Sequence, residues 1–403
     1  MAEWRYVEYQ ELASQERSAF SMGPFGSKIT KGNYVTAGVP VVRGVNLAKG
    51  AFVDDDFVFI TEEKADEIMS ANVEPGDLIF THRGTIGQVS MIPREPRFNR
   101  YVIGSSQVKT RLDEAIARPE FYYYWFRSTE GQQSILANAS TVGVPGIATP
   151  LTSIRKLLVP LPSRGEQDGI VAVLGALDDK IAVNERIAAA ADSLRSAYYL
   201  GAHMDSPDEF RQAPLSGAAE FVNGRPFTKG ATGTGRMVVR IAELNSGPGG
   251  STVYNDIQVP DKHIARPGDV LFAWSGSLTV ARWFRPEAIV NQHIFKVLPK
   301  DHRPMWLVAE LIGLKLEEFR AIAADKATTM GHIQRRHLDE PVLTPNVAMT
   351  QKLDAQLGPL WERALAAEQE SLKLTELRDT LLPQLMSGKL RVREAEKIVE
   401  DAV

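Results

Sequence analysis

Two long stretches with helical periodicity constrain what this chain can fold into. The first covers residues 163–204, where apolar and small side chains recur at steps of three and four and so share one helix face. Ser163 and Glu166 are spaced as a capping box, which predicts the start of the helix. About 36 helical residues at roughly 1.5 Å each give a rod of about 54 Å. A helix of this length needs a partner along its length to be stable.

The second stretch covers residues 346–386 and is the predicted partner. Leu353, Leu360, Ala367, Leu374 and Leu381 recur every seven residues, which is the repeat of a coiled-coil seam. We therefore expect two antiparallel helices that form a coiled coil. The matching face of the first helix has Ile170, Leu174, Leu177, Ile181, Ala188, Ala191 and Tyr198.

Two polar side chains fall on these predicted seams. Asn184 lies on the first helix and Arg378 on the second. A polar residue within a seam can fix the register of a coiled coil. The sequence leaves open whether the two side chains do so or turn toward the flank.

Composition limits the protein class. The chain has 403 residues, no cysteine and a net charge of −4. Disulfides and cysteine-bound zinc are therefore excluded. No apolar leader and no run of 18 apolar residues occurs, so we expect a cytoplasmic protein without a membrane partner. Residues 1–162 carry 17 Lys and Arg against 18 Asp and Glu, so any contact with nucleic acid must come from local clusters.

The stretches outside the two helices repeat each other. Pro75-Gly76-Asp77 is followed by an apolar run, and Pro267-Gly268-Asp269 is followed by a similar one, about 190 residues later. Earlier in each copy, an apolar run ends in an arginine, Arg43 or Arg240. The order is domain, helix, domain, helix. We therefore expect two domains of the same fold, related by a pseudo-two-fold axis, with the two Pro-Gly-Asp turns at equivalent places.

Catalytic motifs are missing from the sequence. It has no phosphate-binding loop, no Gly-x-Gly-x-x-Gly, no Gly-x-Ser-x-Gly and no His-Glu-x-x-His. It also lacks the Asn-Pro-Pro-Tyr and Asp-Pro-Pro-Tyr tetrapeptides, which place an amino group for methylation. These absences favour a binding and scaffolding protein that has no catalytic residues, no metal and no cofactor of its own.

Four motifs, in their order, carry a family resemblance. They are Gly-Pro-Phe-Gly-Ser at 23–27, Pro-Gly-Asp-Leu-Ile-Phe-Thr-x-Arg-Gly-Thr at 75–85, Gly-Glu-Gln at 165–167 and the segment 381–392. Together they resemble the specificity subunit (HsdS) of type I restriction–modification systems. The resemblance covers essentially the whole chain. It implies two target-recognition domains that each read one half of a bipartite site in double-stranded DNA.

The same resemblance implies partners. The coiled coil would be a spacer whose helices dock two DNA methyltransferase (modification) subunits, and restriction (nuclease–translocase) subunits would join this complex. S-adenosylmethionine would belong to the modification subunit, in line with the motifs missing here. The expected fold is α+β, with two similar α/β domains separated by the two helices. The boundaries are 1–162 for the first domain, 163–204 for the first helix, 205–344 for the second domain and 345–403 for the second helix and tail.

Polar residues at matched places in the two copies are candidates for DNA contact. Arginine can make two hydrogen bonds to guanine, glutamine can pair with adenine, and lysine can bind phosphate. For Arg43 and Arg240 a structural ion pair within the domain is an equal alternative. The aromatic run 122–126 is typical of a buried helix rather than a base-stacking platform. The candidates are Lys28, Lys31, Arg43, His82, Arg83, Gln107, Thr141, Lys229, Arg240, Ser275, Gln292, Lys326, Thr328 and Thr329.

Three expectations about function follow. The copies differ where His82-Arg83-Gly84 aligns with Trp274-Ser275-Gly276, so the two half-sites should differ. The near-neutral domains predict weak, strongly salt-dependent DNA binding by the chain alone. A four-residue insertion within 182–192 should lengthen the spacer by one or two base pairs. A stand-alone coiled-coil DNA-binding or adaptor protein is the alternative function, and no motif supports an enzyme that acts alone.

Overall fold

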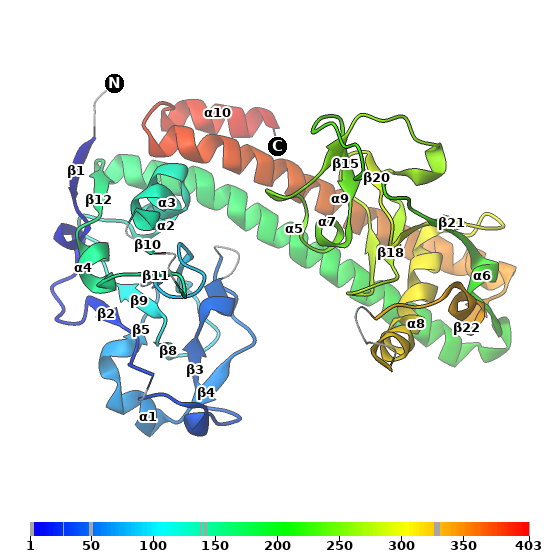
Figure 1. Cartoon of the computed structure of the whole chain (residues 1–403), viewed down its shortest axis with the longest axis horizontal. Coiled ribbons are helices and arrows are strands. Elements are labelled where there is room, and N and C mark those ends of the chain that lie inside the picture. Colours follow the sequence, from blue (N-terminus) through cyan, green and yellow to red (C-terminus); the bar gives the residue numbers. More distant parts are fainter. Residues whose placement is uncertain are drawn as a thin grey trace. The chain divides into compact units, whose positions relative to one another are not determined.

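The fold is described from a computed structural model, which describes residues 4–402 except 27, 48–50, 138, 141–142 and 326–330. The chain forms two compact units (Figure 1). The first contains Met1–Asp178 and Glu376–Val403, and the second contains Asp179–Thr375. Each unit therefore combines one sheet-containing domain with segments of both long helices.

The two long helices are present close to their predicted bounds. Helix α5 spans Arg164–Asp205 and helix α9 spans Val347–Met386. The predicted capping box forms, because the Ser163 N–H donates to the Glu166 carboxylate over 3.0 Å and the Glu166 N–H donates to the Ser163 hydroxyl over 3.4 Å. Asn346 caps α9 by accepting from the Met349 N–H over 2.8 Å.

The helices are antiparallel within the second unit. The Asn184 amide of α5 donates to the Glu370 carboxylate of α9 over 2.8 Å, and Arg195, further along α5, lies 5.6 Å from the ring centre of Trp361, earlier on α9. Between these contacts lies a cluster of small residues, Ala188, Ala191, Ala364 and Ala367. Asn184 is fully buried, so it lies within the seam. Its pairing with Glu370 supports the register-fixing alternative.

In the first unit, Arg378 of α9 pairs with Asp178 of α5 over 2.7 Å. The heptad leucines of α9 from Leu353 to Leu385 are mostly buried, as are Ile170, Leu174 and Leu177 of α5. Tyr198 does not share this face, because its exposed fraction is 53% whereas Tyr199 is fully buried. From Ala191 onward the buried face advances in steps of four, through Arg195 to Tyr199, and this shift moves Tyr198 outward.

The first sheet of each unit has the same strand order. In the first unit the order is β2-β9-β6-β7, and in the second it is β14-β21-β18-β19. All pairs in both sheets are antiparallel. The strands are β2 (Phe20–Met22), β9 (Gln107–Thr110), β6 (Leu78–Thr81), β7 (Val89–Met91), β14 (Ala219–Asn223), β21 (Ile294–Pro299), β18 (Val270–Ala273) and β19 (Thr279–Arg282).

The second sheets also correspond. Their orders are β4-β3-β8-β5 and β16-β15-β20-β17, and in each the central pair, β3 with β8 or β15 with β20, is parallel. The expected fold class, with two similar α/β domains, is therefore confirmed. The strands are β4 (Val58–Ile60), β3 (Val39–Val42), β8 (Tyr101–Ile103), β5 (Asn72–Val73), β16 (Tyr254–Asn255), β15 (Arg236–Val239), β20 (Ala288–Val290) and β17 (Ile264–Ala265).

The two Pro-Gly-Asp turns occupy equivalent places, as predicted. Gly76 and Gly268 have φ of 89° and 94°, and each turn leads into the equivalent strand, β6 or β18. A buried lysine follows the same duplication. The Lys109 ammonium donates to the Asn72 carbonyl over 2.5 Å, and Lys296 donates to the Ile264 carbonyl over 2.6 Å. Each lysine joins the two sheets of its domain.

A two-stranded ribbon completes each domain next to its long helix. It pairs β1 with β12 in the first unit and β13 with β22 in the second. The remaining elements are β1 (Arg5–Glu8), β12 (Leu158–Leu161), β13 (Phe210–Pro214), β22 (Pro341–Pro345), β10 (Ala139–Ser140), β11 (Gly146–Ile147), α1 (Glu62–Glu67), α2 (Pro119–Arg127), α3 (Thr129–Leu136), α4 (Pro150–Arg155), α6 (Leu215–Ala218), α7 (Ile241–Ser246) and α8 (Met305–Asp325).

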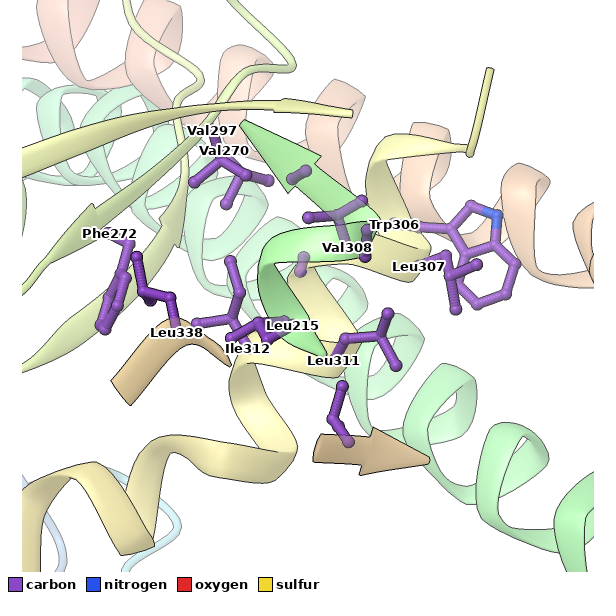
Figure 2. Packing of buried hydrophobic residues seen from close by; sticks show 14 of the residues in the cluster. Leu215, Val270, Phe272, Val297, Trp306, Leu307, Val308, Leu311, Ile312 and Leu338 are labelled. Atoms are coloured by element: carbon purple, nitrogen blue, oxygen red, sulfur yellow. The ribbon is translucent and has the colours of Figure 1, made fainter. Parts of the chain in front are cut away.

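In each unit a helix, α2 or α8, packs on the first sheet and contributes to a hydrophobic core. The predicted burial of the aromatic run is confirmed, since Tyr122, Trp125 and Phe126 of α2 are all at most 1% exposed. In the second unit Leu311 and Ile312 of α8 pack in one cluster with strands β18 and β21 (Figure 2). The same cluster contains residues of α5 and α9, so this core joins the domain to the helices.

The tail predicted beyond α9 contains a further helix, α10 (Val392–Ala402), in the first unit. Helix α9 ends at Met386, and the φ of 66° at Gly388 allows the Lys389 N–H to donate to the Gln384 carbonyl over 3.0 Å. The chain then turns back along α5. A side chain at Gly169 of α5 would approach Val392 to 3.0 Å, so the glycine permits close packing of α10.

Candidate nucleic-acid interface

Three loops meet at one end of the first sheet in the first domain. They follow β2, follow β6 and precede β9, and these strands are neighbours in the sheet. The Gly23 N–H donates to the Gln107 carbonyl and the His82 N–H to the Ser106 carbonyl, both over 2.9 Å. A bridge between Arg83 and Gly146 adds a fourth segment. We call the described residues of 23–31, 82–85, 104–106 and 143–147 the first tip.

The second domain builds the same feature from equivalent loops. The Gly224 N–H donates to the Ile294 carbonyl over 2.9 Å, and the Trp274 N–H donates to the His293 carbonyl over 3.1 Å. A bridge between Ser275 and His332 brings in the fourth segment. The second tip consists of residues 223–230, 274–277, 291–293 and 331–333.

A glycine is required at the base of each tip. A Cβ atom on Gly23 would lie 1.8 Å from the Gly104 carbonyl oxygen, and one on Gly224 would lie 2.0 Å from the Asn291 carbonyl oxygen. In each domain the loop after the first strand therefore crosses directly over the loop before β9 or β21. This crossing holds the tip loops together, and only glycine permits it.

Three of the predicted residues are exposed on the first tip. Lys28, Lys31 and Arg83 lie on the loops that follow β2 and β6. His82 is 8% exposed, and its ring nitrogen Nε2 lies 3.2 Å from the Ser105 carbonyl oxygen. Burial lowers the pKa of His82, and the charge of Arg83 acts in the same direction. The imidazole is therefore neutral at pH 7 and braces the tip rather than presenting a positive charge.

Gln107 lies inside the first domain and is 2% exposed. Its side-chain amide is placed between the Gly104 carbonyl and the Gly44 N–H, each at 3.3 Å. The backbone bonds show that Gln107 is equivalent to Ile294, whereas Gln292 is equivalent to Ser105. The two glutamines therefore do not occupy equivalent positions in the two domains. Gln107 is not presented at the tip surface.

The two arginines that follow β3 and β15 differ in their contacts. Arg240 pairs with the buried Glu243 at 2.5 Å and donates to the Ser251 carbonyl over 2.7 Å, which is the structural alternative considered above. The Arg43 guanidinium donates to the Asp56 carbonyl over 2.7 Å, and its Nε is buried without a partner among the described residues. Arg43 therefore contacts backbone rather than an acid.

In the second domain Lys229 and Gln292 are exposed on the tip, whereas Ser275 is 4% exposed. The sequence analysis missed Arg225, which is also exposed there. The Gln292 N–H donates to the Arg225 carbonyl over 3.1 Å, so these two side chains emerge from adjacent backbone. The available signal was Gly224-Arg225-Pro226-Phe227, which repeats Gly23-Pro24-Phe25 with one inserted residue.

Four of the predicted residues lie outside the described part of the chain. They are Thr141 in the first domain, and Lys326, Thr328 and Thr329 in the second.

The two tips differ in chemistry where His82 is replaced by Trp274. The Trp274 indole N–H donates to the Asn223 side chain over 2.8 Å, and its ring stacks on Phe295 with 5.8 Å between ring centres. His293, which has φ of 73°, lies 5.2 Å from the same indole. One fold thus carries two different sets of surface groups.

The tips differ in charge pairing from one flank of the first domain. Among the residues that the structure describes, the side chains of Lys28, Arg83, Arg225 and Lys229 have no ion-pair partner. On the flank of the first domain, by contrast, Arg94 pairs with Glu114 and Glu120, Arg100 with Glu62 and Asp66, and Arg111 with Glu16, Glu74 and Asp77. Unpaired arginine and lysine at a loop tip are suited to bind phosphate and base edges.

Two further features of the described residues bear on function. No group of three or more histidine and acidic side chains in this part of the chain is arranged to hold a metal ion. None of the helices within these ranges is long and apolar enough to cross a membrane.

Comparison with known proteins gives consistent findings. Residues 1–191 match the model of the type I restriction modification DNA specificity domain. The type I restriction enzyme MjaIX specificity subunit of Methanocaldococcus jannaschii is 22% identical, over 83% of this chain and 82% of that protein. The crystal structure of the type I restriction–modification S subunit from M. genitalium aligns with a TM-score of 0.60 at 15% identity, over 95% of this chain and 96% of that one. The first 191 residues therefore match a type I restriction modification DNA specificity domain, and the fold of the chain is similar to that of a type I restriction–modification S subunit.

Proposed function

We propose that the two tips each read one half of a bipartite site in double-stranded DNA. The observation that carries this proposal is the contrast between unpaired cations on the tips and paired arginines on the flanks. As a specificity subunit, the chain is non-catalytic and recognises DNA. Because the fold is duplicated but the tip residues differ, the two half-sites should have different sequences.

The contacts of each tip follow from its exposed groups. On the first tip, Arg83 is placed to donate to guanine, and Lys28 and Lys31 to bind phosphate. On the second tip, Arg225 and Gln292 are adjacent and can read a guanine and an adenine, while Lys229 binds phosphate. Gln107, His82 and Ser275 are buried or nearly so, and they support the loops from below.

We further propose that the long helices dock two methyltransferase subunits, one at each unit, and that restriction subunits join this complex. A groove supports each position, mainly apolar in the second unit and mixed in the first, where Glu166, Arg393 and Glu396 also line it. In the second unit, Leu194 and Tyr198 of α5 and Leu353 of α9 line a groove of about 500 Å³. In the first unit, Trp4, Ile170 and Val392 line one of about 770 Å³. S-adenosylmethionine would be bound by the docked subunits.

Mapping methylated sites tests this function. The full chain is expressed with the methyltransferase of its native host, and methylation is mapped across a genome. We expect one bipartite motif with two different halves. Arg225→Ala should weaken or relax only the half read by the second domain, by about 1–3 kcal/mol, or roughly 5- to 160-fold. Arg211→Ala removes another exposed arginine of the same domain, on β13, and should leave both halves unchanged.

Two results would contradict the proposal. A continuous motif for the wild type would refute bipartite reading. A change in the first half-site caused by Arg225→Ala would refute the assignment of tips to halves. Failure to co-purify any methyltransferase from the native host would instead favour a stand-alone DNA-binding or adaptor protein.

A further inference from the structure

One arginine of the second domain contacts both long helices. Arg282, the last residue of β19, has a side chain that is 3% exposed. Its guanidinium makes two bonds to the Asp192 carboxylate of α5, over 3.1 and 3.0 Å. It makes two more to the Glu368 carboxylate of α9, over 2.7 and 3.0 Å. The same group lies 4.3 Å from the ring centre of Trp361 on α9. We call these four residues the clamp.

A second contact close to the clamp ties the domain to the same helices. Arg195 of α5 pairs with Glu310 of α8 at 2.5 Å, and the Ser196 hydroxyl donates to the same carboxylate over 2.9 Å. Arg195 faces Trp361 at 5.6 Å from the ring centre, so this indole contacts both guanidinium groups. The side chains of Arg195 and Glu310 are 9% and 6% exposed, so breaking their pair would leave a desolvated charge without compensation.

The first domain has no such arginine. Leu78 pairs with Met91 in the first sheet as Val270 pairs with Arg282 in the second, so Met91 occupies the equivalent position. The first domain contacts α5 through the Tyr124 hydroxyl, which donates to Asp178 over 2.8 Å, and through Arg118 and Arg127, which pair with Asp168 at 3.0 Å and with Asp178 at 3.9 Å. Arg378, which also pairs with Asp178, comes from α9 and not from the domain. Among the residues that the structure describes, an arginine that pairs with acids of both long helices is thus seen in the second domain and not in the first.

We propose that Arg282 is a positioning residue that sets the angle of the second domain on the long helices and thereby restricts the spacer length between the half-sites. This inference rests on the function proposed above. Two bidentate pairs to two helices fix the plane of the guanidinium as well as its position. A half-site one base pair further along B-DNA is displaced by about 3.4 Å and rotated by about 35°. The second domain cannot follow that rotation while all four bonds of Arg282 persist.

The test uses the complex of the full chain with its methyltransferase and a DNA library. The library holds the two wild-type half-sites at the native spacer and at spacers one or two base pairs shorter or longer. Arg282→Lys keeps the positive charge but loses both bidentate pairs. We expect its preference for the native spacer over the adjacent spacers to fall by about tenfold, which corresponds to about 1.4 kcal/mol. The half-sites should stay the same.

A matched control is available in the same domain. Arg266 also pairs with two acids, Asp261 at 2.5 Å and Glu287 at 2.8 Å, but all three residues belong to the domain itself. Arg266→Lys should therefore keep the wild-type spacer preference. Glu368→Gln is a milder change to the clamp, because Asp192 still holds the arginine, and it should lower the preference by less than Arg282→Lys does.

The outcomes separate positioning from stability and from reading. Arg282→Lys that unfolds at a lower temperature but keeps the spacer preference would overturn the inference, because the clamp would then be merely structural. An altered half-site would overturn it in favour of a reading role. Loss of all methylation by both clamp variants, or a wild-type preference in Glu368→Gln, would also overturn it. A wild type that methylates no bipartite site would refute the proposed function itself, and the inference with it.

Discussion

Inserting four residues into both long helices should lengthen the spacer of the recognised site by one base pair and leave both half-sites unchanged. The insertions follow Ile181 in α5 and Lys373 in α9. They lie between the Asp178–Arg378 pair on one side and the Asn184–Glu370 pair on the other. Because the helices are antiparallel, equal insertions in both can preserve both pairs.

The expected size of the change follows from helix geometry. Four residues add about 6 Å to a helix and about 40° beyond one full turn. One base pair of B-DNA adds about 3.4 Å and about 35°. The added helix length corresponds to one or two base pairs of B-DNA, and the added helix rotation corresponds to one base pair. Mapping methylated sites for the wild type and the variant measures the spacer directly.

The structure explains why an insertion in α5 alone is the less informative experiment. Within 182–192, Asn184, Ala188 and Ala191 are buried against α9, and Asp192 belongs to the clamp. Four extra residues there would shift each of these against its partner. We expect this single-helix variant to be less stable and serve as the control. If the double-insertion variant is active and its spacer is unchanged, the length of the helices does not set the spacer length. If a half-site changes, the helices also affect which bases are read.

Local signals in the sequence were sufficient to predict the helices and the duplication. A capping box at Ser163 and a seven-residue repeat after Asn346 act within a few residues of the features they predict, and the helices begin at Arg164 and Val347. The Pro-Gly-Asp turns likewise determine the local backbone before β6 and β18. Such features depend on residues that are near in the sequence, so the structure contains them as the sequence predicts.

The candidate site was predicted less completely because its details depend on contacts distant in sequence. Gln107 is buried because the loop at Gly23 crosses over the strand end. Arg225 was missed because the inserted residue hid the repeat of Gly-Pro-Phe. The role of Arg282 depends on Asp192 and Glu368, which lie about 90 residues before and after it in the sequence. No local pattern predicts that pairing.

Replacing Gly224 by alanine should destabilise the second domain by about 3 kcal/mol and nearly abolish methylation. A Cβ atom there would lie 2.0 Å from the Asn291 carbonyl oxygen and 2.4 Å from that of Val290. Both obstructing atoms belong to the backbone, so no side-chain rotation can relieve the clash and the loop must move away. Because Arg225 and Gln292 lie on the two crossing segments, the same movement would separate the groups proposed to read the second half-site.

Denaturant unfolding of the full chain and the methylation rate of the complex measure the two effects. Gly217→Ala in α6 is the matched control, because a Cβ atom at Gly217 has no other atom within 4 Å, and it should change stability by less than about 0.5 kcal/mol. Gly23→Ala should have the equivalent effect on the first domain, since its Cβ atom would lie 1.8 Å from the Gly104 carbonyl oxygen. If Gly224→Ala behaves like Gly217→Ala, the crossing does not hold the tip together, and the shared architecture of the two tips has another cause.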